Sequence, residues 1–459
     1  MANSFIDQSS KECMKTELEL FHVVDTQASL GNYHYVRYYP ITSIEKNGPV
    51  EILLHANSDT YFDLNESFLF LDFTIVDGTG ANITKVTDAT ATTYANQIVA
   101  PVNAFHSSFF RSVEINMNNK LVSQTDNLYP YKAIIQDIIS SGSDAKNTFL
   151  ERKIYYGDEG DAIDTFHTTD VIENSDGLDD VKNIGLAKRF LLSRNSKSFS
   201  SFGKIYSELF QQQKLIPGDN EIRIKLHRAD STFCLLAKSD ISYGIKLNKA
   251  VMYVKQYEIP PHIREAQAKV LQKQNMKFPV KHIEMKFFTK GSGRQDLSEQ
   301  NLVSGVLPRR CYITLVSSEA FNGKITKNPF NFQNFGVSEI ILRKNGMPVP
   351  YEKLSVDYTN KKYDEGYFSF LQSAGYLYRN GGPSLTYEQF ANGYAIYGFD
   401  LSSDPSPDNT CLDLIQEGKL SLSMSLASAS TESITIIAYL EYDKIIEIDK
   451  DKSVITNYE

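Results

Sequence analysis

Short stretches in which apolar and polar residues alternate recur along most of the chain. Residues 420–426 read Leu-Ser-Leu-Ser-Met-Ser-Leu, and residues 222–226 alternate in the same way. Residues 50–54 and 68–76 are short apolar runs rich in β-branched and aromatic side chains. Successive side chains of a strand point to opposite faces, so these patterns predict strands with a buried face. The longer apolar run at residues 434–442 predicts a central strand.

Turn signals separate the predicted strands, and helical patterns are scarce. Asn345-Gly346 is a strong short hairpin signal, and Asn118-Asn119 is a plausible one. Residues 131–139 could form a short helix. A second helix is predicted within residues 259–278, where apolar residues at helical spacing share one face: Ile263, Ala266, Val270 and Leu271. Strands recurring between turns, with so few helices, predict an all-β chain.

A block of the sequence occurs twice. Residues 103–115 and 328–340 share Asn, Phe, Phe, Glu and Ile at identical spacing. Two weaker echoes keep the same order in both halves: residues 63–69 with 296–302, and residues 209–215 with 414–420. A repeat of this length is a whole domain rather than a solenoid unit. We therefore expect two tandem eight-stranded β-sandwiches in which the repeated blocks occupy equivalent positions.

The duplication and the linking helix give a predicted division of the chain. Each half has somewhat over 200 residues, which suits a β-sandwich with long loops. The polar start has no regular period, and the end is charged and mixed. The expected segments are an N-terminal arm (1–16), a first sandwich (17–258), a linker helix (259–278), a second sandwich (279–443) and a C-terminal tail (444–459).

Composition excludes several classes of function. The chain has 459 residues and a formal net charge of −9, whereas a protein that coats nucleic acid is usually basic. We therefore expect no direct sequence-specific binding to nucleic acid. No apolar run approaches the length of a membrane span, and the start has no signal-peptide pattern. The cysteines form no CxxC pair, so free thiols are expected: Cys13, Cys234, Cys311 and Cys411.

Motifs that carry catalysis are missing. The sequence has no GxxxxGK[ST], GxSxG or HExxH, so we assign no catalytic, cofactor-binding or metal-binding residue and expect no enzyme activity. Residues 157–180 are rich in carboxylates but lack calcium-loop spacing, which favours an exposed acidic loop over a metal site. The basic residues near Lys188 and Arg189 alternate with apolar ones, which favours packing over phosphate binding.

Several short segments, spread from residue 17 to the end, resemble one family. They are residues 17–21, 99–103 with 105–107, 127–131, 321–323 with 327–332, 393–394 with 399–401, and 442–443 with 446–449. As a set they resemble the hexon-like major capsid proteins of Polinton and adintovirus elements. That family is part of the double-jelly-roll capsid lineage shared with adenoviruses and tectiviruses.

The resemblance implies an architecture and a function. Two jelly rolls would lie side by side in one chain, and three chains would give six similar lobes in a pseudo-hexameric tile of an icosahedral shell around a DNA genome. The implied location is the virion capsid, and the implied partners are other copies of the chain and a penton-type minor capsid protein. The residues leave two alternatives open: a tandem-sandwich carbohydrate- or receptor-binding protein, and a sandwich-type glycoside hydrolase.

Overall fold

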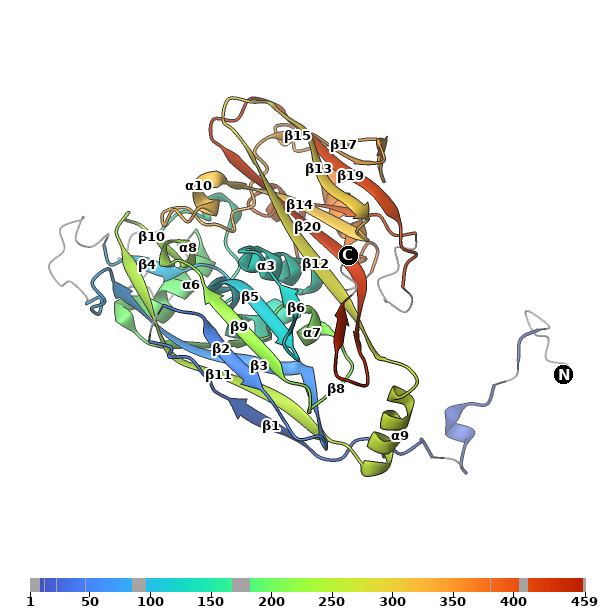
Figure 1. Ribbon diagram of the computed structural model, residues 1–459. Helices are drawn as coiled ribbons and strands as arrows, with labels where there is room; N and C mark the ends of the chain where they lie inside the picture. The colour runs from blue at the N-terminus through green and yellow to red at the C-terminus, as the bar shows by residue number, and fades with distance from the viewer. Residues whose placement is uncertain are drawn as a thin grey trace.

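The computed structural model describes residues 9–84, 96–166, 182–403 and 412–456, except residues 12, 22, 46 and 380. Figure 1 shows two β-rich lobes, and the helix α9 (Pro261–Leu271) lies on the connection between them. The first lobe is blue to green in that view, and the second is yellow to red. The short linking helix predicted within residues 259–278 is therefore confirmed.

The first lobe is built from two antiparallel sheets. Each is a path of four main strands, and the strands are out of sequence order, as long crossing connections require. One path runs β1 (Tyr33–Tyr38), β11 (Tyr243–Glu258), β3 (Thr60–Asp77), β7 (Phe199–Gly203), and the other runs β2 (Val50–Leu54), β9 (Ile222–Arg228), β5 (Phe110–Met117), β6 (Lys120–Gln124).

The second lobe repeats this topology strand for strand. Its two paths are β12 (Met276–Lys290), β20 (Ile434–Ile448), β14 (Arg310–Ser317), β18 (Ile396–Asp400), and β13 (Asp296–Val306), β19 (Glu417–Leu426), β15 (Val337–Lys344), β16 (Met347–Pro348). In both lobes the first main strand pairs with the last, and the second pairs with the seventh. Within the described residues each lobe thus contains eight main strands in jelly-roll order, which confirms the predicted all-β fold.

Short elements fill the connections between the main strands. In the first lobe they are η1 (Thr16–Leu18), β4 (Val99–Pro101), α2 (Phe105–Ser108), α3 (Tyr129–Ser140), α4 (Ser143–Lys146), η2 (Phe149–Lys153), η3 (Gly160–Ala162), α6 (Ile184–Ser193), η4 (Arg194–Ser196), α7 (Glu208–Gln211), β8 (Ile216–Pro217), α8 (Ser231–Cys234) and β10 (Leu235–Ala237). In the second they are α10 (Ser318–Phe321), β17 (Leu354–Ser355), α11 (Asp364–Ser373), α12 (Tyr387–Ala391) and β21 (Val454–Thr456).

The repeated segments differ in whether their two copies occupy equivalent positions in the two lobes. The block 103–115 runs into β5 and the block 328–340 runs into β15, which hold equivalent positions, so this prediction is confirmed. The third echo falls near the equivalent strands β9 and β19 but at different places, because 209–215 precede β9 whereas 417–420 already belong to β19. The echo of 63–69 in 296–302 is wrong, because it pairs β3 with the non-equivalent β13. Both segments are amphipathic strands, and that shared pattern carries no topology.

Local chemistry accounts for strands and turns. On β19 the side chains of Leu420, Leu422 and Met424 are buried, as the alternation predicts. The β5–β6 hairpin turns at Asn118-Asn119 with φ of 49° and 66°, and the β15–β16 hairpin turns at Asn345-Gly346 with φ of 51° and 83°. Asn and Gly tolerate positive φ, which matches the twist of the flanking strands. Both predicted hairpins are confirmed.

The end of the chain differs from the predicted tail at residues 444–459. Strand β20 continues to Ile448, and β21 folds back to pair with it. Ile446, Ile448 and Val454 are buried in the hydrophobic core of the first lobe, because their alternate spacing directs them to one face. The described part of this segment is therefore ordered within the chain itself. The other predicted domain boundaries remain predictions.

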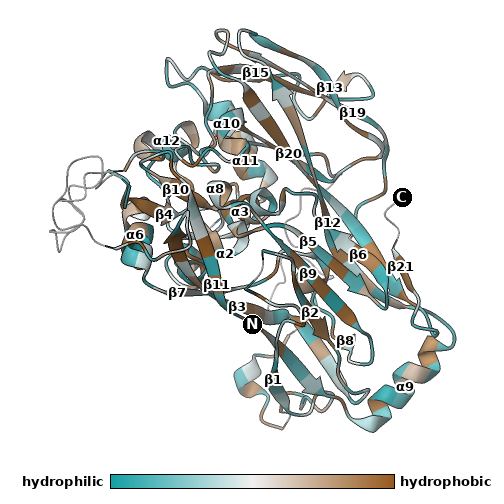
Figure 2. Cartoon of the chain, turned by 60° about the vertical axis from the view of Figure 1, so that its left-hand side comes forward, coloured by the Kyte–Doolittle hydropathy of each residue, from teal (hydrophilic) through white to brown (hydrophobic). Residues whose placement is uncertain are grey.

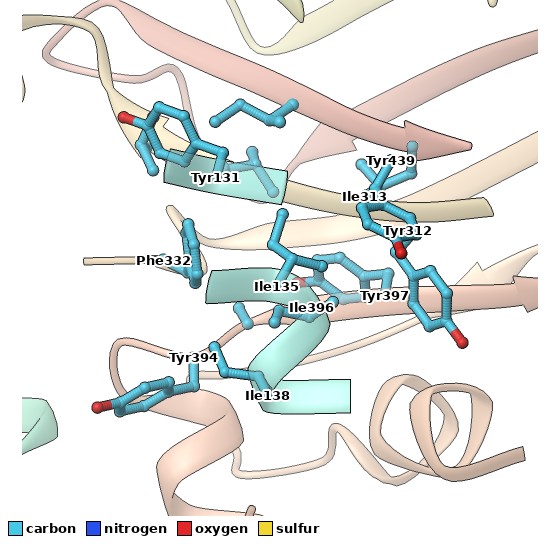
Figure 3. Close-up of a cluster of buried hydrophobic side chains, with 14 of the residues drawn as sticks. Tyr131, Ile135, Ile138, Tyr312, Ile313, Phe332, Tyr394, Ile396, Tyr397 and Tyr439 are labelled. Atoms are coloured by element: carbon cyan, nitrogen blue, oxygen red, sulfur yellow. The ribbon is translucent and has the colours of Figure 1, made fainter. Parts of the chain in front are cut away.

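Helix α3 joins the two lobes. It follows β6 of the first lobe, yet its apolar side chains pack in a cluster with residues of the second lobe. Figure 3 shows Ile135 and Ile138 of α3 beside Ile396 and Tyr397 of β18. Tyr131, at the start of α3, stacks on Phe321 with ring centroids 5.6 Å apart. Burial of this apolar surface holds the lobes together as one unit.

Candidate assembly surfaces

A fully buried arginine lies at the junction of the lobes. Arg189 projects from α6 and donates from Nε to Pro101 O at 2.9 Å and from Nη1 to Tyr156 O at 2.8 Å. Its Nη2 donates to Asp158 Oδ1 at 2.7 Å. A buried guanidinium is tolerated only when it is paired and its donors are satisfied, as they are here. The preference for packing over phosphate binding near Arg189 fits this position.

The buried partner Asp158 connects the first lobe to the repeated block of the second. Its Oδ2 accepts from Asn328 Nδ2 at 3.0 Å, and the backbone N–H of Asn328 donates to Asp164 Oδ1 at 2.6 Å. The carboxylate-rich composition of residues 157–180 predicts an exposed acidic loop. This prediction is wrong for Asp158 and Asp164, because both serve as acceptors between the lobes, whereas Gly157 and Glu159 are exposed. Residues 167–180 lie outside the described residues.

A second buried ion pair lies at the junction of the lobes. Glu208 on α7 lies 3.3 Å from Lys132 Nζ on α3 and 3.3 Å from His282 Nδ1 on β12 of the second lobe, and it accepts from Ser123. Burial alone would raise the pKa of the Glu208 carboxyl. The Lys132 ammonium and His282 outweigh that effect and hold its pKa well below the usual range. The Glu208 carboxylate therefore stays charged inside the junction.

His106 belongs to the repeated block of the first lobe and is buried. Its Nδ1 lies 2.9 Å from Ser201 Oγ, and Lys153 is close behind it, paired with Asp137. Burial, followed by the Lys153 charge, lowers the pKa of His106 to about 3. The imidazole therefore stays neutral in the folded chain at mildly acidic pH, where it would be protonated in the unfolded chain.

We expect acid to destabilise the protein through His106. The unfolded imidazole takes up a proton below about pH 6.5, whereas the folded one does not until about pH 3. The free energy of unfolding therefore decreases as the pH is lowered from about 6.5 to about 3. Between pH 7 and pH 4.5 this loss is about 2.5 kcal/mol. Urea unfolding of His106→Asn should show a smaller loss over the same range. Equal losses in the variant and the wild type would contradict this assignment.

An aromatic stripe crosses the outward face of the sheet β1-β11-β3-β7. We define it as Tyr33, Tyr35, Phe68, Phe202, Tyr253 and Tyr257. Phe68 and Tyr253 stack at 4.9 Å, and Phe68 lies 5.9 Å from Tyr35 and 5.7 Å from Phe202. Tyr33, Tyr35 and Phe202 are exposed. Contiguous exposed apolar surface of this kind marks an interaction site.

The central strands of the equivalent sheet in the second lobe are covered. All eight residues of β14 are buried, as are the first nine of β20, so both faces of these two central strands are packed against other parts of the chain. Their outer neighbours include α3 of the first lobe and α11, whose Ser373 carbonyl accepts from Tyr312. The edge strand β12 is less covered, and its Phe287 is 51% exposed. Within the described residues the two equivalent sheets thus differ: the first exposes three aromatic side chains of the stripe, whereas the second exposes one, Phe287 of β12.

An apolar groove of about 710 Å³ lies beside α9. It is lined by Leu215, Ile259, Ile263, Val270, Leu271 and Phe278, among others. None of the residues of α9 is buried in the single chain, although the helix carries the apolar stripe seen in the sequence. Figure 2 shows brown and teal residues side by side on this helix. The groove and the helix form a second candidate surface.

The chemistry searched for in the sequence is not assembled in the described parts of the chain. There, no three His, Cys, Asp or Glu side chains gather as metal ligands. Cys13 is an exposed free thiol, Cys234 and Cys311 are buried free thiols, and Cys411 is outside the described residues. Among the described helices, none is long and apolar enough to cross a membrane.

The aromatic stripe could not be predicted from the sequence. The apolar face of α9 could be predicted, but the groove beside it could not. The aromatics come from four strands that are distant in sequence, so only pairing brings them together. Their one signal was the abundance of 27 Phe and 27 Tyr residues, which was read as strand propensity alone. The apolar face of α9 was visible at its helical spacing, but a sequence does not show what a helix faces.

The two equivalent sandwiches in one chain define a double jelly roll. Solved structures share this architecture over nearly the full length. A chain of the Sputnik virophage has a TM-score of 0.62 at 14% identity, covering 100% of this chain and 94% of that one. The faustovirus major capsid protein has a TM-score of 0.56 at 8% identity (94% and 92% covered), and that of mavirus 0.55 at 9% (99% and 97% covered).

Sequence relatives add little to this structural likeness. An uncharacterised protein of Caenorhabditis elegans is 23% identical over 430 residues, which cover 92% of this chain and 97% of that protein. No family model matches the chain. The fold is thus that of double-jelly-roll capsid proteins, and the function has to be argued from surfaces.

Proposed function

We propose that this chain is a hexon-like major capsid protein that works as a homotrimer tiling an icosahedral shell around a DNA genome. The observation that carries the proposal is the difference between the two equivalent sheets. In the second lobe the central strands β14 and β20 are covered by the same chain, whereas in the first lobe the aromatic stripe is open. A neighbouring copy is the simplest cover for a face whose duplicate is already covered at its central strands within the chain.

With threefold symmetry, such contacts between copies form a closed ring. Each chain contributes one open aromatic face on its first lobe and one second lobe to cover the face of its neighbour. Such a contact joins different surfaces of the two partners, and three of them close into a ring of six similar lobes. The interface should bury on the order of 2,000 Å² or more, with the stripe at its centre, because aromatic side chains dominate such contacts.

Sedimentation of paired variants tests the trimer. Tyr35→Ser with Phe202→Ser removes two exposed stripe aromatics, and Phe149→Ser with Tyr378→Ser removes two exposed aromatics elsewhere. We expect the wild type and the second variant to sediment as trimers at micromolar concentration, and the stripe variant to dissociate at least about 100-fold more readily. A wild type that is monomeric under every salt condition, or equal trimer affinity in both variants, would overturn the proposal.

The proposal extends to a finer assignment. The motifs from residues 17–21 to 446–449 support a place among the capsid proteins of Polinton and adintovirus elements. In such a shell the chain has a structural and not a catalytic role, its location is the virion capsid, and a penton-type minor capsid protein is its expected partner at the vertices. The segment boundaries 1–16, 17–258, 259–278, 279–443 and 444–459 are part of this proposal, with the β20–β21 strands added to the folded body.

A further inference from the structure

The segment before β1 exposes a dense run of large apolar side chains. We call residues 13–28 the apolar arm. Phe21, Val23 and Val24 are 91%, 92% and 90% exposed, and Leu18 and Leu20 are exposed as well. In Figure 1 the apolar arm extends away from both lobes beyond α9. A soluble chain rarely leaves so many neighbouring apolar residues in water unless another surface covers them.

The groove beside α9 is an apolar surface that lacks a covering segment. Its walls are apolar, but Val270 is 48% exposed and none of the α9 residues is buried. The helix is tied to the first lobe by two side chains: Tyr61 OH donates to Gln267 Oε1 at 2.7 Å, and Arg264 Nη1 donates to Ser58 O at 3.5 Å. The groove is therefore a positioned apolar surface that the single chain leaves unfilled.

Charge and geometry match the apolar arm to the groove of another copy. Lys214 and Lys277 line the groove, and the apolar arm carries the carboxylates of Glu17 and Asp25 beside its apolar residues. Leu30 already lines the groove of its own chain, and its N–H donates to Gln27 Oε1 at 2.9 Å in a turn from which the apolar arm departs. An extended segment of this length spans about 50 Å, enough to reach a neighbouring molecule.

We propose that the apolar arm of one copy docks in the α9 groove of a neighbouring copy and so ties the copies together. This inference rests on the proposed function, because it requires copies to assemble. Burial of Leu18, Leu20 and Phe21 against the apolar wall of the groove supplies the attraction, and the lysines favour the acidic residues of the apolar arm. Exchange of a terminal segment between identical chains is a low-cost way to link them.

Disulfide trapping between two chains that each carry one introduced cysteine tests the exchange. Cys13 and Cys411 are first changed to Ser, and Cys234 and Cys311 remain because they are buried. Full-length chains carrying Leu20→Cys are mixed with isotopically heavy chains carrying Val270→Cys, assembled, and oxidised. The matched control carries Ala268→Cys in place of Val270→Cys.

Ala268 is a suitable control because it is exposed on the same helix but does not line the groove. A cysteine at this position is as accessible to an oxidant as one at Val270, so the two yields differ only in which side of α9 the apolar arm approaches. Only contact between different chains can join the light and heavy variants.

We expect at least about tenfold more light–heavy disulfide with Val270→Cys than with Ala268→Cys. Equal yields, or no mixed product, would overturn the exchange. A chain with both Leu20→Cys and Val270→Cys that forms only an internal disulfide would place the apolar arm in its own groove, which also overturns it. Sedimentation of the same samples separates the two proposals: trimers without the mixed disulfide reject only the exchange, whereas monomers reject the proposed function.

Discussion

Replacing Arg189 with methionine is expected to lower the free energy of unfolding by about 3–5 kcal/mol. Methionine fills much of the same space but leaves the Asp158 carboxylate buried without its cation. The carbonyls of Pro101 and Tyr156 lose their donors at the same time. Removing one partner of a buried pair costs more than the pair contributes, because the remaining charge has no water to solvate it.

The neighbouring Lys188 provides the matched control for this substitution. It lies on the same helix and carries the same charge, but it is exposed. Lys188→Met should change stability by less than about 1 kcal/mol. Urea unfolding measures both, and Arg189→Met combined with Asp158→Asn should recover part of the loss. Equal shifts for Arg189→Met and Lys188→Met would show that the buried pair contributes nothing.

The second large effect is expected at Glu208. Glu208→Ala leaves the Lys132 ammonium buried without its carboxylate and removes the contact to His282 across the lobes. We expect a loss of about 3–5 kcal/mol at pH 7. Glu221→Ala is the control, because Glu221 pairs with Arg223 on the surface, and such a pair contributes at most about 1 kcal/mol.

The pH dependence of this variant has a definite sign. The pKa of Glu208 is lowered in the folded chain, so its contribution is complete above the unfolded carboxyl range, near pH 4.5, and is lost as pH falls toward its folded value. The difference between wild type and Glu208→Ala should therefore be constant from about pH 7 to pH 5 and shrink below about pH 4. A difference that grows on acidification would contradict the assigned charge.

The sequence could predict those features of the fold that are determined by residues close together in the chain. The hairpin residues Asn118 and Asn345 act within their own turns, and the alternation of residues 420–426 acts within one strand, so both features could be predicted from the sequence. The repeated block at 103–115 and 328–340 gave the tandem architecture because equivalent strands require similar packing.

The failures have other causes. The carboxylate of Asp158 looked solvated because its partners, Arg189 and Asn328, are 31 and 170 residues away. The echo at 296–302 repeated an amphipathic pattern that any strand can have. The aromatic stripe exists only after β1, β11, β3 and β7 pair. For Asp158 and the aromatic stripe the energy comes from contacts between residues far apart in the sequence, which no local pattern records.

The direction of the strands gives a way to learn which side of the proposed shell each end of the molecule faces. β20 runs from Ile434 to Ile448, where β21 pairs with it, while the turn before it (427–433) packs beside the 291–295 turn at the far end of the second lobe. The apolar arm emerges beyond α9, at the β21 end. An epitope inserted at 427–433 and a tag on the apolar arm will thus lie at opposite ends, and antibody labelling of intact particles will report which one is outside.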